Sequence, residues 1–246
     1  MFHQWEHDRF LAHVSPNNNA AQQGLHNVVG LLSSASEFDN SVPLSLEQGP
    51  WLAGGSLRSV VENSKRETDY DIFFREESQY EDLADWLAES ERMGYRYSPN
   101  MRFEYRFTKT FEADHLTNYK LEVVPSTENA MFIDRTFSPT AIEYKVQLIH
   151  GGFFHDSAEA LLASFDFTIC QLATDGHTTL IGNSTLYDIS QRKLVMSTVR
   201  YPVATLKRMM KYSRYGYNIC NGEATKFLQG VVNAPDIVET RFKYVD

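Results

Sequence analysis

The stretch from Trp51 to Phe74 constrains this chain most, because apolar segments there flank a glycine pair. Trp51-Leu52-Ala53 is typical of a short buried strand and ends in Gly54-Gly55. Residues Ser56 to Asn63 are expected to form a helix. Residues Tyr70 to Phe74 are aromatic and β-branched and therefore favour a second strand. The sequence thus predicts a strand, a tight turn, a helix and a strand in direct succession.

The glycine turn of this unit is suited to binding an anion. Two glycines allow the backbone to approach a ligand closely, and the N–H groups that open the next helix face an anion. Ser56 adds a hydroxyl donor and Arg58 adds a cation. A Gly-Gly pair alone usually makes only a turn. In this context we expect Gly54, Gly55, Ser56 and Arg58 to form a phosphate-binding cradle.

The second strand of the unit opens with two carboxylates, Asp69 and Asp71. Side chains two apart on a strand share one face, so these charges repel each other unless a cation lies between them. Mg²⁺ or Mn²⁺, bound through oxygen, meets that need. An Asp-x-Asp pair alone is often a solvated strand edge, but here Ile72-Phe73-Phe74 carries the strand inward. A phosphate cradle beside two metal-binding carboxylates indicates nucleotidyl or phosphoryl transfer.

The remainder of the chain predicts an α+β core followed by a mainly helical part. The periodicity of apolar residues predicts helices over residues 21–34, 80–93, 157–163 and 204–215. Further strands are expected over residues 102–107, 120–124, 130–133, 144–149 and 165–171. We place a soft boundary near residue 185. This gives a core of residues 1–185, with an N-terminal helix, and a helical part of residues 186–246.

Composition and charge limit the classes of function. The chain has 246 residues, is 42% hydrophobic and carries a formal net charge of −9, which argues against a whole-surface grip on nucleic acid. The apolar runs are far shorter than the ~20 residues that span a bilayer, and no signal-peptide pattern opens the chain. Cys170 and Cys220 lack metal-binding spacing and are expected to be reduced thiols. We expect a cytoplasmic protein with no membrane partner.

The order of the central unit resembles the nucleotidyltransferase superfamily whose best-known member is DNA polymerase β. The shared motif, Gly-Gly/Ser followed by Asp-hydrophobic-Asp-hydrophobic, matches Gly54, Gly55, Ser56, Asp69, Tyr70, Asp71 and Ile72. The Gly-Gly-Ser-Leu-Arg form looks most like the head domain of CCA-adding enzymes and poly(A) polymerases. The chain departs from them at Ser59, where they usually carry Asp, and has no helix matching their Glu-Asp-x-x-Arg motif. The resemblance implies a polymerase-β-like core, a mixed sheet flanked by helices, with a helical C-terminal part.

A second resemblance covers more of the chain and points to viruses. Uncharacterised nucleotidyltransferase-like proteins of bacteriophages and large DNA viruses are similar at residues 144–149, 165–171, 207–212 and 216–217. Together the two resemblances span roughly residues 50 to 217. They imply the fold and divalent-metal chemistry but no particular substrate. For a viral source, the expected location is the host cytoplasm.

The superfamily usually adds a third carboxylate from a neighbouring strand, where it bridges the catalytic metal. Asp166 lies between Phe165 and Phe167, an unfavourable place for a charge unless it is paired or metal-bound. Glu122, followed by Val-Val-Pro, resembles the acid-then-Pro strand of archaeal CCA-adding enzymes. Gln147 occupies the same kind of position but carries no charge. We expect Asp166 to be the third acid, within ~6 Å of the pair, and keep Glu122 as the alternative.

A strip of basic residues lies on the helix expected after Pro202. It includes Lys207, Arg208 and Lys211, and Lys207 and Lys211 are four residues apart on one face. Such a strip is often just a solvated helix face. We expect these three side chains to contact a nucleoside triphosphate or the backbone of an RNA acceptor.

These features predict a metal-dependent nucleotidyltransferase that binds a nucleoside triphosphate such as ATP. Asp69, Asp71 and a third acid would hold two Mg²⁺ ions, an acceptor hydroxyl would attack the α-phosphate, and pyrophosphate would leave. The acceptor could be an RNA 3′ end, a protein side chain or a small molecule. Two alternatives stay open: a CCA-like enzyme that repairs tRNA 3′ ends, and a non-catalytic module that binds a nucleotide or nucleic acid.

Overall fold

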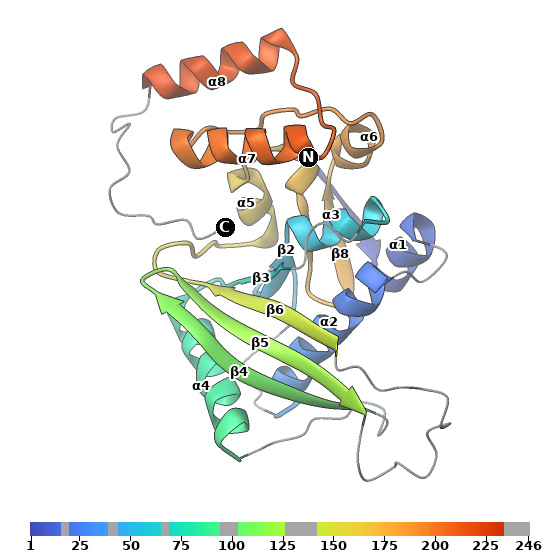
Figure 1. The fold of residues 1–246 in the computed structure, drawn as a ribbon, viewed down its shortest axis with the longest axis vertical. Coiled ribbons are helices and arrows are strands. Elements are labelled where there is room, and N and C mark those ends of the chain that lie inside the picture. Colours follow the sequence, from blue (N-terminus) through green and yellow to red (C-terminus); the bar gives the residue numbers. More distant parts are fainter. Residues whose placement is uncertain (16–19, 39–43, 65–68, 94–102, 126–141, 234–246) are drawn as a thin grey trace.

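The computed structural model describes residues 1–15, 20–38, 44–64, 69–93, 103–125 and 142–233, in which strands build one mixed sheet (Figure 1). The sheet has eight strands in the order β1-β8-β7-β2-β3-β6-β5-β4. Their bounds are β1 Phe2–Glu6, β2 Trp51–Ala53, β3 Asp69–Phe73, β4 Phe103–Ala113, β5 Leu116–Pro125, β6 Ile142–Ile149, β7 Leu172–Thr174 and β8 Thr178–Gly182. Strands β3 and β6 pair in parallel, and the other neighbours pair antiparallel.

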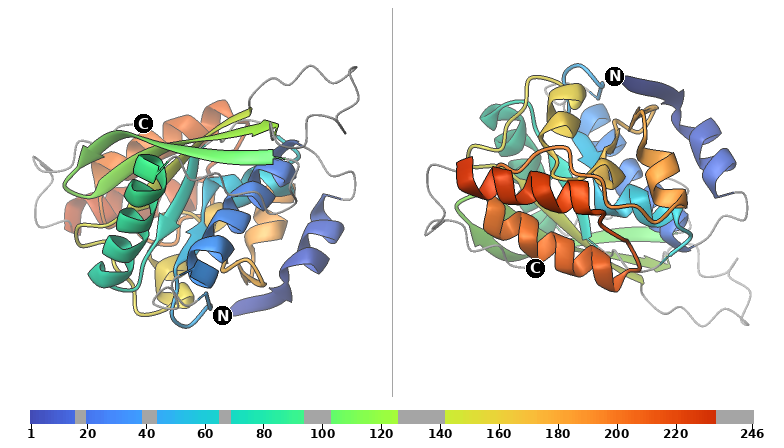
Figure 2. Two further views of the ribbon diagram at one scale, coloured as in Figure 1. Left: turned by 90° about the horizontal axis from the view of Figure 1, so that it is seen from below. Right: turned by 90° about the horizontal axis from the view of Figure 1, so that it is seen from above.

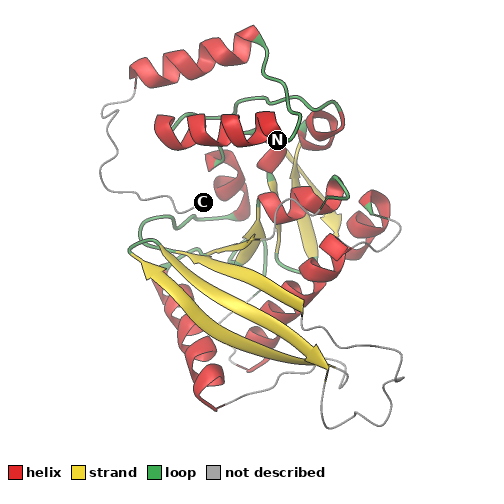
Figure 3. Ribbon diagram, viewed as in Figure 1, coloured by secondary structure: helices red, strands yellow, loops and turns green. Residues whose placement is uncertain are grey.

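Helices cover both faces of this sheet (Figure 2). They are α1 His7–Val14, α2 Ala20–Phe38, α3 Gly55–Val61, α4 Glu77–Met93, α5 Ala158–Ser164, α6 Thr185–Ser190, α7 Pro202–Arg214 and α8 Asn221–Asn233. Helices α7 and α8 lie side by side at the top of the molecule in the view of Figure 3. The α+β class predicted from the sequence is confirmed.

The unit from β2 to β3 folds as its sequence pattern predicts. Leu57 and Val60 of α3 join the main core, together with Tyr70 and Ile72 of β3. The alternation of β3 turns Asp69, Asp71 and Phe73 to the opposite face of the sheet. On that face Phe73 packs against a second core cluster built around α5. The two carboxylates therefore lie on the α5 side of the sheet.

The segment from Phe165 to Gln171 is not the strand that its apolar residues predict. Phe165 caps the C-terminus of α5, Thr168–Cys170 forms a short 3₁₀ helix, and a strand begins only at Leu172. Apart from the Gln171 carbonyl, which accepts from Gly182, the long-range backbone hydrogen bonds of this segment go to residues 195–198, because Thr168 donates to Val195 and Asp166 accepts from Ser197 and Thr198. Its buried apolar side chains are therefore placed by a turn rather than by a strand.

Other differences lie at the edges of the sheet. Strand β1 and helix α1 were not expected from the sequence, and β1 pairs with β8 along one edge. The strands expected around 102–107 and 120–124 belong to one long hairpin, β4–β5. The strand expected at residues 130–133 falls outside the described residues.

A buried histidine joins α1 to the sheet. His7 is 2% exposed, and its Nδ1 lies 2.8 Å from the Thr179 hydroxyl and 3.1 Å from the Thr174 hydroxyl. Burial, helped by the nearby His26, lowers the pKa of His7 to about 4. The ring is therefore neutral in the folded protein at neutral pH.

His7 is expected to make stability fall in mild acid. Below pH 6.5 the unfolded chain protonates this histidine and the folded chain does not until about pH 4, so stability is lost through that window. The full effect is about 3 kcal/mol. His7→Asn, whose amide can replace Nδ1, should remove this part of the pH dependence in urea titrations between pH 7 and 4. His3→Asn, at an exposed position, is the control, and equal slopes for wild type and His7→Asn would contradict the assignment.

Candidate functional site

Two carboxylates define the site, and strand register gives each of them a neighbour on β6. Asp69 is opposite Lys145, and Asp71 is opposite Gln147. Lys145 Nζ lies 3.2 Å from Asp69 Oδ2. With the Gln147 amide oriented by its hydrogen-bond network, its nitrogen donates to Asp71 Oδ1 at 2.8 Å. A cation and an amide thus stabilise the two carboxylates on the same face of the sheet.

A cavity opens on this face, between the sheet and α7. Its walls combine the glycine turn after β2, the two carboxylates of β3 and side chains that α7 directs inward. The lining residues that matter for phosphate chemistry are Gly54, Gly55, Asp69, Asp71, Asp166, Arg208 and Lys211. The structure therefore brings most of the site residues predicted from the sequence into one cavity.

The glycine turn has a backbone that few other residues adopt. Gly54 has φ 86° and ψ −128°, and its N–H donates to the Leu172 carbonyl. Ser56, two residues on, is 3% exposed, and no described residue is a hydrogen-bond partner for its hydroxyl. Ser56 does not itself line the cavity.

Arg58 does not contact the cavity, contrary to the expectation that it supplies a cation to the cradle. Its side chain is 0% exposed, with the guanidinium 4.5 Å from the centre of the Tyr212 ring. Its Nε lies 3.7 Å from a Glu62 oxygen, and its Nη1 lies 3.6 Å from Cys170 Sγ. Arg58 is therefore a buried ion-pair partner behind the glycine turn.

Asp166 lines the same cavity but reaches it from the connection between α5 and the 3₁₀ helix, not from a strand. Its side chain is 5% exposed and forms an ion pair with Arg208. Among the residues that the structure describes, no three acidic, histidine or cysteine side chains are grouped closely enough to hold a metal. The position beside Asp71 on the neighbouring strand belongs to Gln147.

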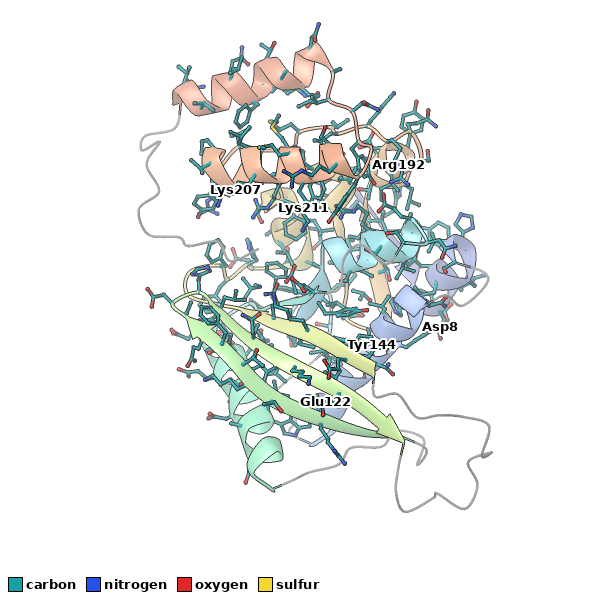
Figure 4. All side chains as sticks on the ribbon, in the orientation of Figure 1. Asp8, Glu122, Tyr144, Arg192, Lys207 and Lys211 are labelled. Atoms are coloured by element: carbon teal, nitrogen blue, oxygen red, sulfur yellow. The ribbon has the colours of Figure 1, made fainter. Side chains whose placement is uncertain are left out.

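Glu122 lies away from the cavity, on β5. Strand β6 separates β5 from β3, so Glu122 is two strands, or ~10 Å, to the side of the carboxylate pair. It forms an ion pair with Lys120 at 2.6 Å. Figure 4 shows Glu122 on the sheet, well separated from Lys211 on α7.

The basic strip of α7 divides between the cavity and the surface. Arg208 and Lys211 line the cavity and are half-buried. Lys207 is exposed and does not line it. Helical spacing explains the division, because residues three apart lie on one face and their immediate neighbours turn away.

A match to a known protein family shows which proteins this chain is related to. Residues 27–192 match the family model described as Gabija anti-defense 2 family protein. The chain belongs to the Gabija anti-defense 2 family. The matched range contains β2, α3 and β3, and therefore both carboxylates and the glycine turn, whereas Arg208 and Lys211 follow it.

A curated relative in the Gabija anti-defense 2 family comes from Bacillus phage SPbetaL7. It is 28% identical over 190 residues, which is 76% of this chain and 37% of the relative. The chain thus spans little more than a third of the length of that phage protein. In the part of the present chain that the structure describes, no helix is long and apolar enough to cross a membrane.

Solved structures of CCA-adding enzymes share the fold of this family member. An apo form matches with a TM-score of 0.53 at 12% identity, over 93% of this chain and 46% of the enzyme. A complex of a CCA-adding enzyme with ATP matches with the same TM-score of 0.53, at 14% identity and the same coverage of 93% and 46%. The predicted nucleotidyltransferase fold is confirmed, and at this identity the likeness concerns the fold alone.

Several residues that line the cavity, or that contact its carboxylates from outside it, were not predicted from the sequence as site residues. Lys145, opposite Asp69, belongs to a strand that was predicted, but its place depends on the pairing of β6 with β3. His115, Phe153 and Tyr201 line the cavity from three separate connections. Their spacing along the chain carries no pattern, so only the tertiary fold reveals them.

The ion pair between Asp166 and Arg208 is open to a direct test. Arg208→Gln leaves a buried carboxylate without its cation and should lower the free energy of unfolding by about 2 kcal/mol. Combining it with Asp166→Asn should recover part of the loss, measured by urea denaturation as a double-mutant cycle. Lys207→Gln, on the exposed side of the same helix, is the matched control. If Arg208→Gln proved as stable as this control, the pair would contribute nothing in solution.

Proposed function

We propose that this chain is a divalent-metal-dependent nucleotidyltransferase, transferring a nucleoside monophosphate from a nucleoside triphosphate to an acceptor hydroxyl. The observation that carries the proposal is the placement of Asp69 and Asp71 in one cavity with Gly54 and Gly55. Arg208 and Lys211 enter the same cavity from α7. Carboxylates for a metal and cations for phosphate thus converge within a nucleotidyltransferase fold.

The residues present fit one Mg²⁺ or Mn²⁺ shared with substrate phosphates. Mg²⁺ is usually held by one or two carboxylates together with phosphate oxygens, and Asp69 and Asp71 are such a pair. When bound, the ion would neutralise phosphate charge and lower the pKa of an acceptor hydroxyl. Gln147 would keep the Asp71 carboxylate oriented, and Lys145 would hold Asp69 until the ion arrives.

The reaction follows from positioning and charge. The acceptor hydroxyl gives its proton to water as its oxygen forms a bond to the α-phosphorus, the bond from that phosphorus to its bridging oxygen breaks, and pyrophosphate leaves. Arg208 and Lys211 are the side chains in this cavity that would bind the leaving phosphates. The peptide groups of Gly54 and Gly55 would allow the triphosphate to approach the backbone.

The family name supports a role against the Gabija defense, carried out in the host cytoplasm. The acceptor of the nucleoside monophosphate is an RNA 3′ end, a protein side chain or a small molecule. The net charge of −9 weighs against a long RNA. The shared fold of CCA-adding enzymes keeps tRNA 3′-end repair as an alternative, with the basic side chains of α7 contacting the RNA.

A second candidate function is a non-catalytic module that binds nucleotide. It is favoured by Gln147, which lies beside Asp71 at the position from which the superfamily usually supplies its third acid. Lys145 also occupies the space next to Asp69. Both residues lower the need for metal at the site.

Asp69→Asn and Asp71→Asn are expected to reduce transfer at least ~100-fold, because each removes a charged metal ligand. Their unfolding midpoints should stay near that of the wild type, since Asp69 is 36% exposed and its ion pair with Lys145 contributes little. The assay uses labelled nucleoside triphosphates, Mg²⁺ and cell extract, and a labelled acceptor names the substrate. Asp85→Asn, at an exposed position on α4, is the control.

The result also separates the two candidates. Full transfer by either site variant would end the proposed mechanism. Nucleotide binding by calorimetry without transfer of any labelled nucleotide would favour the binding module instead.

A further inference from the structure

The floor of the cavity changes from polar to apolar along the strands. Strand register places Phe73, Ile149 and Leu116 side by side on β3, β6 and β5, one step beyond the row formed by Asp71, Gln147 and Asn118. All three apolar side chains line the cavity. The cavity thus has a phosphate end, near the carboxylates, and an apolar end.

Aromatic rings wall the apolar end from three connections. The Phe153 ring, between β6 and α5, lies 6.1 Å from the Tyr201 ring, which precedes α7. The same ring lies 6.0 Å from His115, at the turn between β4 and β5. Phe153 and Tyr201 are half-buried, and all three rings line the cavity. Flat apolar surface is therefore gathered at one end of a polar hollow.

Two polar side chains lie beside these aromatic rings. His155 and Arg200 line the same end, and the Arg200 guanidinium is 5.5 Å from the centre of the Tyr201 ring. Burial, and then the charge of Arg200, lowers the pKa of His155. A neutral imidazole offers one donor and one acceptor. Such a surface suits a flat ligand with hydrogen-bonding edges better than an alkyl chain.

The spacing between the two ends matches a nucleotide. Two residues along a strand advance ~7 Å, which separates the row of Asp71 from the row of Phe73. In a nucleotide the ribose separates the base from the α-phosphate by a step of similar size. A triphosphate held at the carboxylates would therefore extend its nucleoside over the apolar row.

We infer that this aromatic end, formed by His115, Phe153 and Tyr201 over Phe73 and Ile149, is the binding subsite for the nucleobase. The inference rests on the proposed function, because it takes the triphosphate end as given. Phe153 and Tyr201 provide the ring surface on which the base stacks, and His155 and Arg200 contact its edge.

The test separates binding of the base from binding of the phosphates. Tyr201→Ala and Phe153→Ala should each weaken nucleoside triphosphate binding about tenfold in calorimetry with Mg²⁺, the loss typical of one stacking partner. Both should bind inorganic tripolyphosphate with Mg²⁺ as tightly as the wild type does. Tyr201→Phe, which keeps the ring, should restore nucleotide affinity. Gly55→Val, in the glycine turn, should weaken the binding of both the nucleoside triphosphate and tripolyphosphate.

A control variant and three further outcomes distinguish failure of the subsite from failure of the proposed function. Tyr187→Ala, an exposed aromatic residue on α6, is the control and should change neither affinity. Unchanged nucleotide affinity in the Tyr201 and Phe153 variants would overturn the subsite, and their loss of transfer with intact nucleotide binding would assign this end to the acceptor instead. A wild type that binds neither nucleotide nor tripolyphosphate would overturn the proposed function itself.

Discussion

The alternation of β3 is the constraint on which the site depends. Tyr70 and Ile72 are buried in the main core with α3, so the side chains between them must face the other side of the sheet. A slip of one residue would bury two carboxylates and expose two large apolar side chains. The hydrophobic core therefore sets the orientation of Asp69 and Asp71, and no ligand is needed to hold them there.

Parallel pairing with β6 then adjusts the chemistry of the two carboxylates. Lys145 compensates the charge of Asp69, and Gln147 donates to Asp71. Both contacts reduce the repulsion that two adjacent carboxylates would otherwise have in the absence of metal. A divalent ion bound as proposed would have to displace the Lys145 ammonium group from Asp69, so its affinity would depend on how readily Lys145 moves aside.

The parts predicted correctly from the sequence depend on local patterns. The unit from β2 to β3 carries its strand periodicity, its glycine turn and its Asp-x-Asp pair within one short stretch. The position and partner of Asp166 were harder to predict from the sequence. Phe165 and Phe167 suit either a strand or a turn, and the partner, Arg208, is 42 residues further along the chain. Arg58, three residues after the glycine pair, suggests a ligand contact, and only its packing against Glu62 and Tyr212 reveals that it is buried.

The buried position of Arg58 has a mechanical consequence for the cavity. Through its contacts with Tyr212 and Glu62, and through the Glu62 hydrogen bond from Tyr217 at 2.6 Å, α3 is joined to α7 and the segment that follows it. Pulling these helices apart would disturb a buried guanidinium and a buried carboxylate that compensate each other's charge. The buried ion pair therefore ties the glycine turn and the cationic helix together on one side of the cavity, whereas the wall around Phe153 is built on Gly151 and Gly152, whose positive φ angles of 63° and 94° a side chain would strain.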